Sequence, residues 1–209
     1  MKSLLSFLFV LVICVATAQP VKLELLPFKN DMIGRQYYKG TIVQGKKWKD
    51  SKGINILVLT TAEVKYEKTQ QGEFGDEDGK TELYAYHFIL KDTPQLQWKI
   101  YDFVGWCGLD VICEFYKNSL TITDLDNDGE AESTFLYAQA CKGDVSPNGK
   151  KLIMHEGITK YAIRGASLLE MNKEKMGGEK RPDAAFATAP KAFVDYANKQ
   201  WGKFGLVKY

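Results

Sequence analysis

Histidine is scarce in this sequence, because only 2 of the 209 residues are His. A chain with only two imidazole side chains is a poor candidate for histidine-based catalysis or for a histidine-ligated zinc site. The Gly-x-Ser-x-Gly, His-Glu-x-x-His and Cys-x-x-Cys patterns and a phosphate-cradling glycine loop are also absent. The sequence therefore shows no recognisable catalytic set, and nothing in it supports a thioredoxin-like redox enzyme.

A large excess of one charge is missing as well. The 28 basic and 26 acidic residues give a formal net charge of +2, which argues against a nucleic-acid-binding protein. Hydrophobic residues make up 45% and charged residues 26% of the chain, which is typical of a folded protein and excludes a disordered tail or a repeat fibre.

Long apolar runs are limited to one, Leu4–Val15, which follows Lys2 and precedes Ala16-Thr17-Ala18. At about 12 residues it is too short to span a bilayer of roughly 30 Å as a helix. A basic start, a short apolar centre and an Ala-x-Ala end predict a signal peptide over 1–18 and an exported protein, periplasmic or extracellular, with no transmembrane segment. A lipoprotein anchored at Cys14 is the alternative, but Ile13 stands where lipidation needs a small side chain.

The mature chain, 19–209, reads as a single β-rich domain. Short β-rich segments recur between turns without helices of crossover length, so antiparallel pairing is expected. The predicted fold is mainly β, with antiparallel meander sheets in a sandwich or partial propeller-like arrangement. The expected strands are 53–61, 82–90, 98–104, 111–116, 119–123, 133–138, 152–156 and 160–164.

One helix is expected near the C-terminus, where Phe193, Ala197, Trp201 and Phe204 recur at helical spacing. The preceding segment, residues 172–190, is polar and contains glycines and prolines, so it is expected to be a loop. Residues 70–80 are polar, acidic and glycine-rich, and they are expected to form a hairpin loop.

The acidic segment 124–132 is the most specific feature of the chain. Carboxylates occupy alternate residues, Gly129 permits a sharp turn, and the backbone carbonyl of Glu130 adds a further oxygen. Since closely spaced carboxylates repel one another, a divalent cation would offset that repulsion. The spacing predicts a calcium site rather than a bare acidic turn. The candidate ligand residues are Asp124, Asp126, Asp128, Glu130 and Glu132.

This segment departs from an EF-hand, because Phe135 stands where that loop places a bidentate Glu and both flanks have the composition of strands. It resembles the calcium hairpins of integrin-type propeller repeats. Those proteins repeat the motif, whereas it occurs once here. A single site of this kind indicates structural rather than catalytic calcium.

Three cysteines remain after the leader, Cys107, Cys113 and Cys141, so one disulfide and one free thiol are expected in an oxidising compartment. Spacing alone leaves the pairing open, because either Cys107 or Cys113 could reach Cys141. Closing a loop of about 35 residues would stabilise the fold by roughly 4 kcal/mol.

Much of the chain from about residue 80 to 205 resembles a small family of exported proteins of Gram-negative bacteria that is labelled surface polysaccharide biosynthesis. The resemblance implies a role at the cell envelope. Cys113 lies outside the family's pattern, which favours a Cys107–Cys141 disulfide. The stretches that carry the resemblance are 98–104, 123–129, 141–147, 151–156 and 160–165.

The Cys107–Cys141 bridge would bring Asp110 and Asp144 together. Paired carboxylates could serve acid–base chemistry on a glycan, with Glu156 as a further candidate. The alternative is a capped turn, in which Asp144 and Ser146 bond to nearby groups.

Three functions are compatible with these features. The leading hypothesis is an exported, calcium-stabilised envelope protein that binds a glycan or a protein partner. The alternatives are a carbohydrate-active enzyme that uses Asp110, Asp144 or Glu156, and an inhibitor module against a wall-degrading hydrolase.

Overall fold

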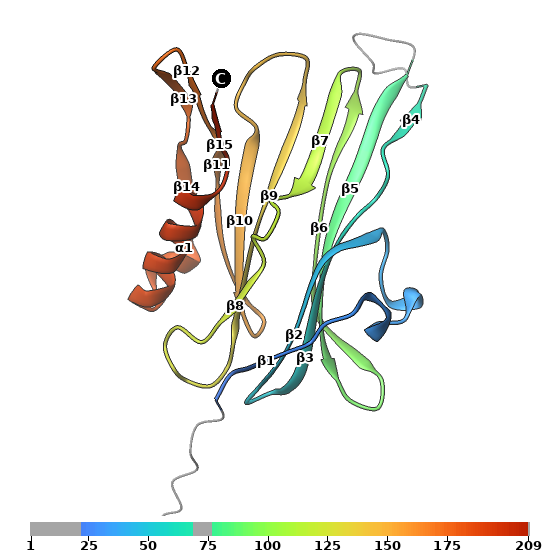
Figure 1. The fold of residues 1–209 in the computed structure, drawn as a ribbon, viewed down its shortest axis with the longest axis vertical. Coiled ribbons are helices and arrows are strands. Elements are labelled where there is room, and N and C mark those ends of the chain that lie inside the picture. The colour runs from blue at the N-terminus through green and yellow to red at the C-terminus, as the bar shows by residue number, and fades with distance from the viewer. Residues whose placement is uncertain (1–21, 69–76, 209) are drawn as a thin grey trace, which may run out of the picture.

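The computed structural model describes residues 22–68 and 77–208, and most of them lie in antiparallel strands (Figure 1). The predicted mainly β fold with a C-terminal helix is confirmed for this part of the chain. The predicted signal peptide lies outside the described residues. No helix within 22–68 and 77–208 has the length and apolarity needed to cross a membrane.

The first large sheet, sheet A, has six strands and antiparallel pairing throughout. Its order is β1-β2-β3-β5-β4, and β6 pairs along the other edge of β5. The strands are β1 (Glu24–Leu26), β2 (Thr41–Asp50), β3 (Gly53–Thr61), β4 (Lys65–Glu67), β5 (Asp78–Leu90) and β6 (Pro94–Cys107).

The second large sheet, sheet B, also has six strands, in the order β14-β11-β10-β9-β7 with β8 paired to β9. Its β10–β11 hairpin is closed by the two residues Gly157 and Ile158. The strands are β7 (Asp110–Phe115), β8 (Thr121–Thr123), β9 (Glu132–Lys142), β10 (Gly149–Glu156), β11 (Thr159–Ala166) and β14 (Lys180–Pro182).

The two sheets face each other in a sandwich, with the main hydrophobic core between them (Figure 1). Alternating residues of each strand point inward and bury their side chains against the opposite sheet. Sheet A contributes Leu57, Leu59, Leu83 and Ala85, and sheet B contributes Phe115, Phe135, Tyr137 and Ile153.

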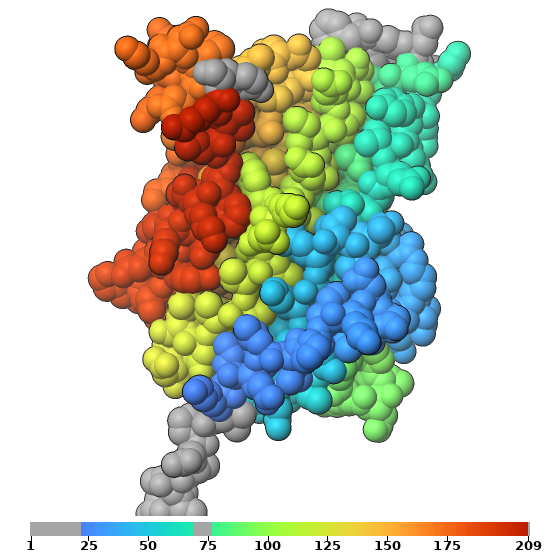
Figure 2. Space-filling model, viewed as in Figure 1, coloured from blue at the N-terminus to red at the C-terminus, as the bar shows by residue number. Residues whose placement is uncertain are grey.

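Each sheet also has a covered outer face. The helix α1 (Lys191–Lys203) lies on sheet B and buries Phe193, Ala197 and Trp201, as its sequence spacing predicted. On sheet A the cover is the N-terminal segment with the short helices η1 (Asn30–Met32) and η2 (Arg35–Tyr37), which crosses the lower part of the molecule in blue (Figure 2).

The prediction of a loop over 172–190 is wrong in part. The segment contains β13 (Glu174–Gly177), β14 and the short helix η3 (Ala184–Ala187), and β13 pairs with β12 (Leu168–Met171) in a small third sheet with β15 (Leu206–Lys208). Asn172 and Lys173 have φ values of +50° and +72°, the geometry of a tight hairpin turn. Strand prediction depends on alternating apolar residues, and polar edge strands lack this alternation. They are therefore predicted as loops.

Other strand assignments differ from expectation for the same reason. Strand β2 was not predicted, because lysines interrupt its apolar pattern. Strand β5 begins at Asp78, inside the expected loop over 70–80, and residues 70–76 of that loop lie outside the described residues.

Candidate functional site

The acidic segment forms the loop between β8 and β9, in sheet B. Its two tightest positions are Asn127 and Gly129, with φ values of +61° and +86°. Asparagine and glycine tolerate this left-handed conformation better than other residues. The loop therefore folds back sharply between two strands, as the sequence predicted, and it is not flanked by helices.

Two overlapping groups of carboxylates gather at this loop. Asp124, Asp126 and Asp128 each present one oxygen within 4.8 Å of the others, and so do Asp126, Glu132 and Glu156. Asp126 belongs to both groups. Six to eight oxygens at short range are what calcium requires, and carboxylates are its usual ligands.

Glu156 was predicted as a possible acid–base residue and not as part of the acidic cluster. It joins the cluster through strand pairing, because β10 aligns Glu156 directly opposite Glu132 on β9. Burial, followed by the charges of the neighbouring acidic residues, raises the pKa of Glu156. Two carboxylates opposite each other in a sheet are unfavourable unless a cation or proton lies between them.

The most informative residue of the cluster is Glu132, which is fully buried. Its Oε2 accepts hydrogen bonds from Thr123 Oγ1 at 2.9 Å and Leu125 N at 3.0 Å, whereas its Oε1 has no partner among the described residues. Asp124 Oδ1 is likewise buried without a partner. Burial raises the pKa of Glu132 to about 7. Unpartnered buried oxygens are costly, so they fit a cation site.

The side chain of Glu130 does not belong to the cluster. Its carboxylate lies 3.1 Å from Lys52 Nζ, on the turn between β2 and β3. The same turn donates a hydrogen bond from Ser51 N to Gly129 O at 2.8 Å, and Asp50 Oδ2 accepts one from Ala131 N at 3.3 Å. Sheet A therefore holds the acidic loop of sheet B at three points.

Cys107 and Cys141 form the disulfide, with 5.6 Å between their Cα atoms. This agrees with the pairing that the family resemblance implied. Cys113 is free and buried, and burial raises the pKa of its thiol to about 12. A thiol with so high a pKa is unreactive at neutral pH.

The predicted acidic residues near the disulfide do not share a site with Glu156. Ser146 Oγ donates a hydrogen bond of 2.7 Å to Asp144 Oδ1 within a turn, as the capped-turn alternative expected. Asp110 opens β7 and pairs with Lys142 at the end of β9. Glu156 lies opposite the first residue of β9, so roughly 30 Å of strand separates it from that end.

A second feature, not predicted from the sequence, is a row of exposed rings on the outer side of β6. The β6 aromatic row consists of Tyr101, Phe103 and Trp106, which are 46%, 39% and 56% exposed. The rings of Tyr101 and Phe103 are stacked with centroids 5.8 Å apart, and Phe103 and Trp106 are 6.2 Å apart. Lys80 Nζ lies 5.5 Å from the Phe103 centroid.

A bulge in β6 extends this row by one ring. The β5–β6 register shifts where Gly105 and Trp106 lie, and Trp106 has a φ of +55°. In a regular strand Trp106 would face the core, because alternate residues point to opposite sides. The bulge exposes Trp106 and buries the next residue, Cys107, for the disulfide.

Comparisons with known proteins bring no further assignment: no family model, curated protein or solved structure matches this chain. The resemblances to the envelope family and to the calcium hairpins remain predictions.

Proposed function

We propose that this protein is an exported, calcium-stabilised β-sandwich of the cell envelope that binds a glycan on the β6 aromatic row. The observation that carries the proposal is the exposure of three neighbouring rings on one strand. Burying exposed aromatic surface is strongly favourable, so rings left in contact with water in a defined row indicate a binding surface.

A glycan is the partner class that fits this row. One face of a sugar ring presents C–H groups, which pack on the electron-rich face of an aromatic ring. Polar groups border the rings: Glu82 accepts a hydrogen bond of 3.0 Å from the Tyr101 hydroxyl, and Lys99 Nζ lies 5.8 Å from the Tyr101 centroid. These groups supply hydrogen bonds to sugar hydroxyls beside the stacked rings.

Removing the rings tests the glycan proposal. We expect Tyr101→Ala combined with Trp106→Ala to weaken polysaccharide binding at least about ten-fold, because central aromatic residues dominate interface energies. Affinity electrophoresis against a panel of bacterial envelope polysaccharides measures the loss. Leu25→Ala, which removes an exposed apolar side chain from β1 at the far edge of sheet A, is the matched control. Failure of every polysaccharide to bind the unaltered protein contradicts the proposal.

Calcium is proposed as the structural ion of the acidic loop, held by Asp124, Asp126, Asp128, Glu132 and Glu156. The support is the buried Glu132, whose Oε1 has no hydrogen-bond partner within 22–68 and 77–208 and whose carboxylate presents an oxygen within 4.8 Å of Asp126 and Glu156. Because the turn after β2 holds the same loop, an ion bound there would also stabilise the contact between the sheets.

Chelation tests this second part. At calcium about 100-fold above its dissociation constant, binding stabilises the folded state by about 2.7 kcal/mol, which corresponds to roughly 5–10 °C in melting temperature. We expect EDTA to remove this difference, and Asp126→Ala or Glu156→Gln to remove most of it. Asp92→Ala, an exposed carboxylate on the β5–β6 turn, is the control and should leave it unchanged. Equal melting curves with and without calcium would refute the calcium assignment.

A further inference from the structure

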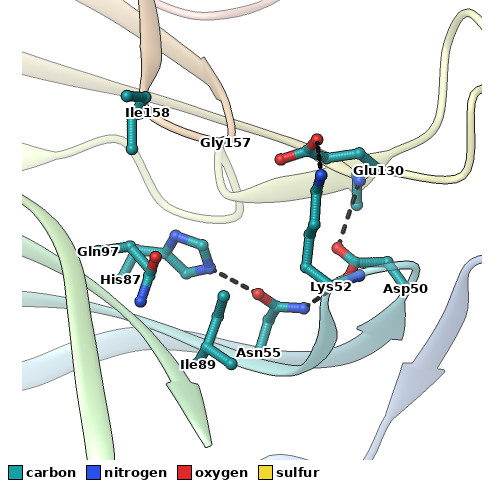
Figure 3. Close-up of a pocket in the computed structure, with 10 residues that line it drawn as sticks. Asp50, Lys52, Asn55, His87, Ile89, Gln97, Glu130, Gly157 and Ile158 are labelled. Carbon is teal, nitrogen blue, oxygen red and sulfur yellow. Dashed lines mark hydrogen bonds and ion pairs between the residues drawn. The ribbon is translucent and has the colours of Figure 1, made fainter.

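Two lysines that border the acidic loop and the β6 aromatic row are neutralised by neighbouring carboxylates. Lys52 pairs with Glu130 at the cavity beside the acidic loop (Figure 3). Lys80 Nζ, next to the Phe103 ring, lies 3.2 Å from Glu82 Oε1. Because each ammonium group has an acidic partner, neither gives its surface an excess of positive charge.

Lys99 of β6 differs from these two lysines, because no carboxylate neutralises it. Its side chain is exposed, and its ammonium group forms no ion pair or hydrogen bond with any residue of 22–68 and 77–208. Since successive residues of a strand point to opposite faces, Lys99 lies on the same side of β6 as Tyr101 and Phe103. The β6 aromatic row is therefore preceded, on its own face, by an unneutralised positive charge.

Three tyrosine rings hold the Lys99 ammonium group in place. Its Nζ lies 5.1 Å from the ring centroid of Tyr84, 5.7 Å from that of Tyr86 and 5.8 Å from that of Tyr101. Tyr84 and Tyr86 are each only 4% exposed, so they form a fixed surface beneath the lysine. Cation–π attraction orients an ammonium group and leaves its charge available to an anion. A cation held in this way loses less side-chain freedom on binding a ligand than a free lysine does.

The groups around Lys99 favour an anion at this position. Glu82, the acidic residue that borders the row, accepts hydrogen bonds from two tyrosine hydroxyls and pairs with Lys80, so its oxygens are already engaged. A second exposed lysine, Lys39, lies beside Tyr86, because Lys39 N donates a hydrogen bond of 3.2 Å to the Tyr86 hydroxyl. Positive charge is therefore in excess at this end of the row.

The Phe103 end of the row has no such excess. Lys80 and its partner Glu82 also line a pocket there, in which carboxylates outnumber lysines. The charged residues of this pocket are Glu63, Lys65, Glu67, Lys80 and Glu82. An anionic group of a ligand on the row is consequently expected next to Tyr101 and not next to Phe103.

We propose that the β6 aromatic row binds an acidic glycan, with sugar rings stacked on the aromatic side chains and an anionic substituent beside Tyr101 bound by the Lys99 ammonium group. A carboxylate and a sulfate ester both present anionic oxygens, and a lysine binds either one as a point charge. This inference rests on the glycan-binding function proposed for the row, and it adds the chemical class of the glycan.

Two pairs of polysaccharides, each with a common backbone, test the preference for charge. They are hyaluronan with its carboxyl-reduced form, and dextran sulfate with dextran. In affinity electrophoresis of residues 19–209, we expect at least one acidic member to bind about three- to five-fold more tightly than its neutral partner, the effect of one exposed ion pair. The difference should shrink as salt is added, because salt screens exposed charges. Neutral members that bind as tightly as the acidic ones overturn the inference.

Substitutions at Lys99 show whether this residue carries the preference. Lys99→Met keeps an unbranched apolar side chain over the tyrosines but removes the charge, so it should abolish the preference for the acidic member. Lys99→Arg keeps the charge and should retain the preference.

Lys49→Met is the matched control. Lys49 is also exposed and without an ion pair in the described part of the chain. It lies on the same face of sheet A as Lys99, but on β2, with β3 and β5 between it and β6. This variant should keep the full preference. A preference that persists in Lys99→Met, or one that Lys49→Met reduces equally, contradicts the inference.

The proposed function and this inference fail in different ways. Binding of neutral and acidic polysaccharides with equal affinity, lost when Tyr101 and Trp106 are replaced with alanine, supports the row and overturns the acidic class. If none of these four polysaccharides and no envelope polysaccharide binds, the glycan function of the row is refuted and the acidic class is refuted with it.

Discussion

Asp50 shows how one side chain can join several parts of this protein. It is buried at the end of β2, and its two oxygens accept hydrogen bonds from two indole or amide side chains and two backbone amides. One of those amides, Ala131 N, belongs to the acidic loop of the other sheet. The carboxylate thereby stabilises the turn after β2, fixes the orientation of Asn55 and connects the two sheets.

His87 should make the stability of the protein depend on pH. Burial lowers its pKa to about 4, while a charge on Asp50 acts weakly in the opposite direction. In the unfolded chain its pKa is about 6.5, so between these values the unfolded state binds a proton that the folded state excludes. The stability that His87 contributes is fully present above pH 6.5 and is lost as the pH falls towards 4, by about 3 kcal/mol.

The measurement is the free energy of unfolding at pH 7.5 and at pH 4.0, for the unaltered protein and for His87→Gln. Glutamine cannot titrate, so the variant should lose less stability between the two pH values. The carboxylates titrate in both proteins and cancel in the comparison. Burial and then the charge of His87 lower the pKa of His155, so the variant reduces the pH dependence of both histidines in the same direction. Parallel pH profiles would show that His87 does not carry this dependence.

At the scale of elements, helix α1 is held by its apolar side. Phe193 is fully buried and packs edge-on against Tyr161 of β11, with ring centroids 5.6 Å apart. Lys150 of β10 donates hydrogen bonds to Trp201 O and Phe204 O at the end of the helix. The helix therefore completes the outer core of sheet B.

We expect Phe193→Ala to lower the free energy of unfolding by about 3–5 kcal/mol, since it leaves a cavity between helix and sheet. Denaturant unfolding followed by circular dichroism measures the change. Lys199→Ala, on the exposed side of the same helix, should change stability by less than about 0.5 kcal/mol. A similar stability for the two variants would mean that the helix contributes little to the core.

The bulge in strand β6 allows the strand both to present the β6 aromatic row and to form the disulfide. Its outer side carries the β6 aromatic row, and its last residue, Cys107, turns inward to the disulfide. In a strand without a bulge, Trp106 would point toward the core and Cys107 toward the outer side, because successive residues point to opposite faces. The bulge at Gly105 and Trp106 resolves this conflict.

For the molecule as a whole, the disulfide is a covalent link between the two sheets, from β6 of sheet A to β9 of sheet B. The bridged cysteines are 34 residues apart. Replacing both with serine should lower the free energy of unfolding by about 4 kcal/mol while the sandwich still forms. Thermal unfolding of the Cys107→Ser/Cys141→Ser variant measures this loss.

Thiol labelling of residues 19–209 without any substitution is the companion control. Without reductant, an alkylating reagent should modify Cys113 only after denaturation, because its thiol is buried and has a raised pKa. Labelling of Cys107 or Cys141 under these conditions would contradict the assigned pairing.

Local patterns in the sequence determined the strands that alternate strongly, the helical spacing of Phe193, Ala197 and Trp201, and the sharp acidic turn with Gly129. These features depend on residues a few positions apart, so the chain itself encodes them. Polar edge strands such as β13 carry no such pattern and were missed.

Only the tertiary structure decided which distant residues meet. Strand register places Glu156 beside Glu132, and the packing of the sheets brings Asp50 to Ala131 and encloses His87. These contacts join residues between 24 and 81 positions apart. A sequence pattern with a period of two or of 3.6 residues carries no information about which strands become neighbours, because register is set by the burial of the whole sheet.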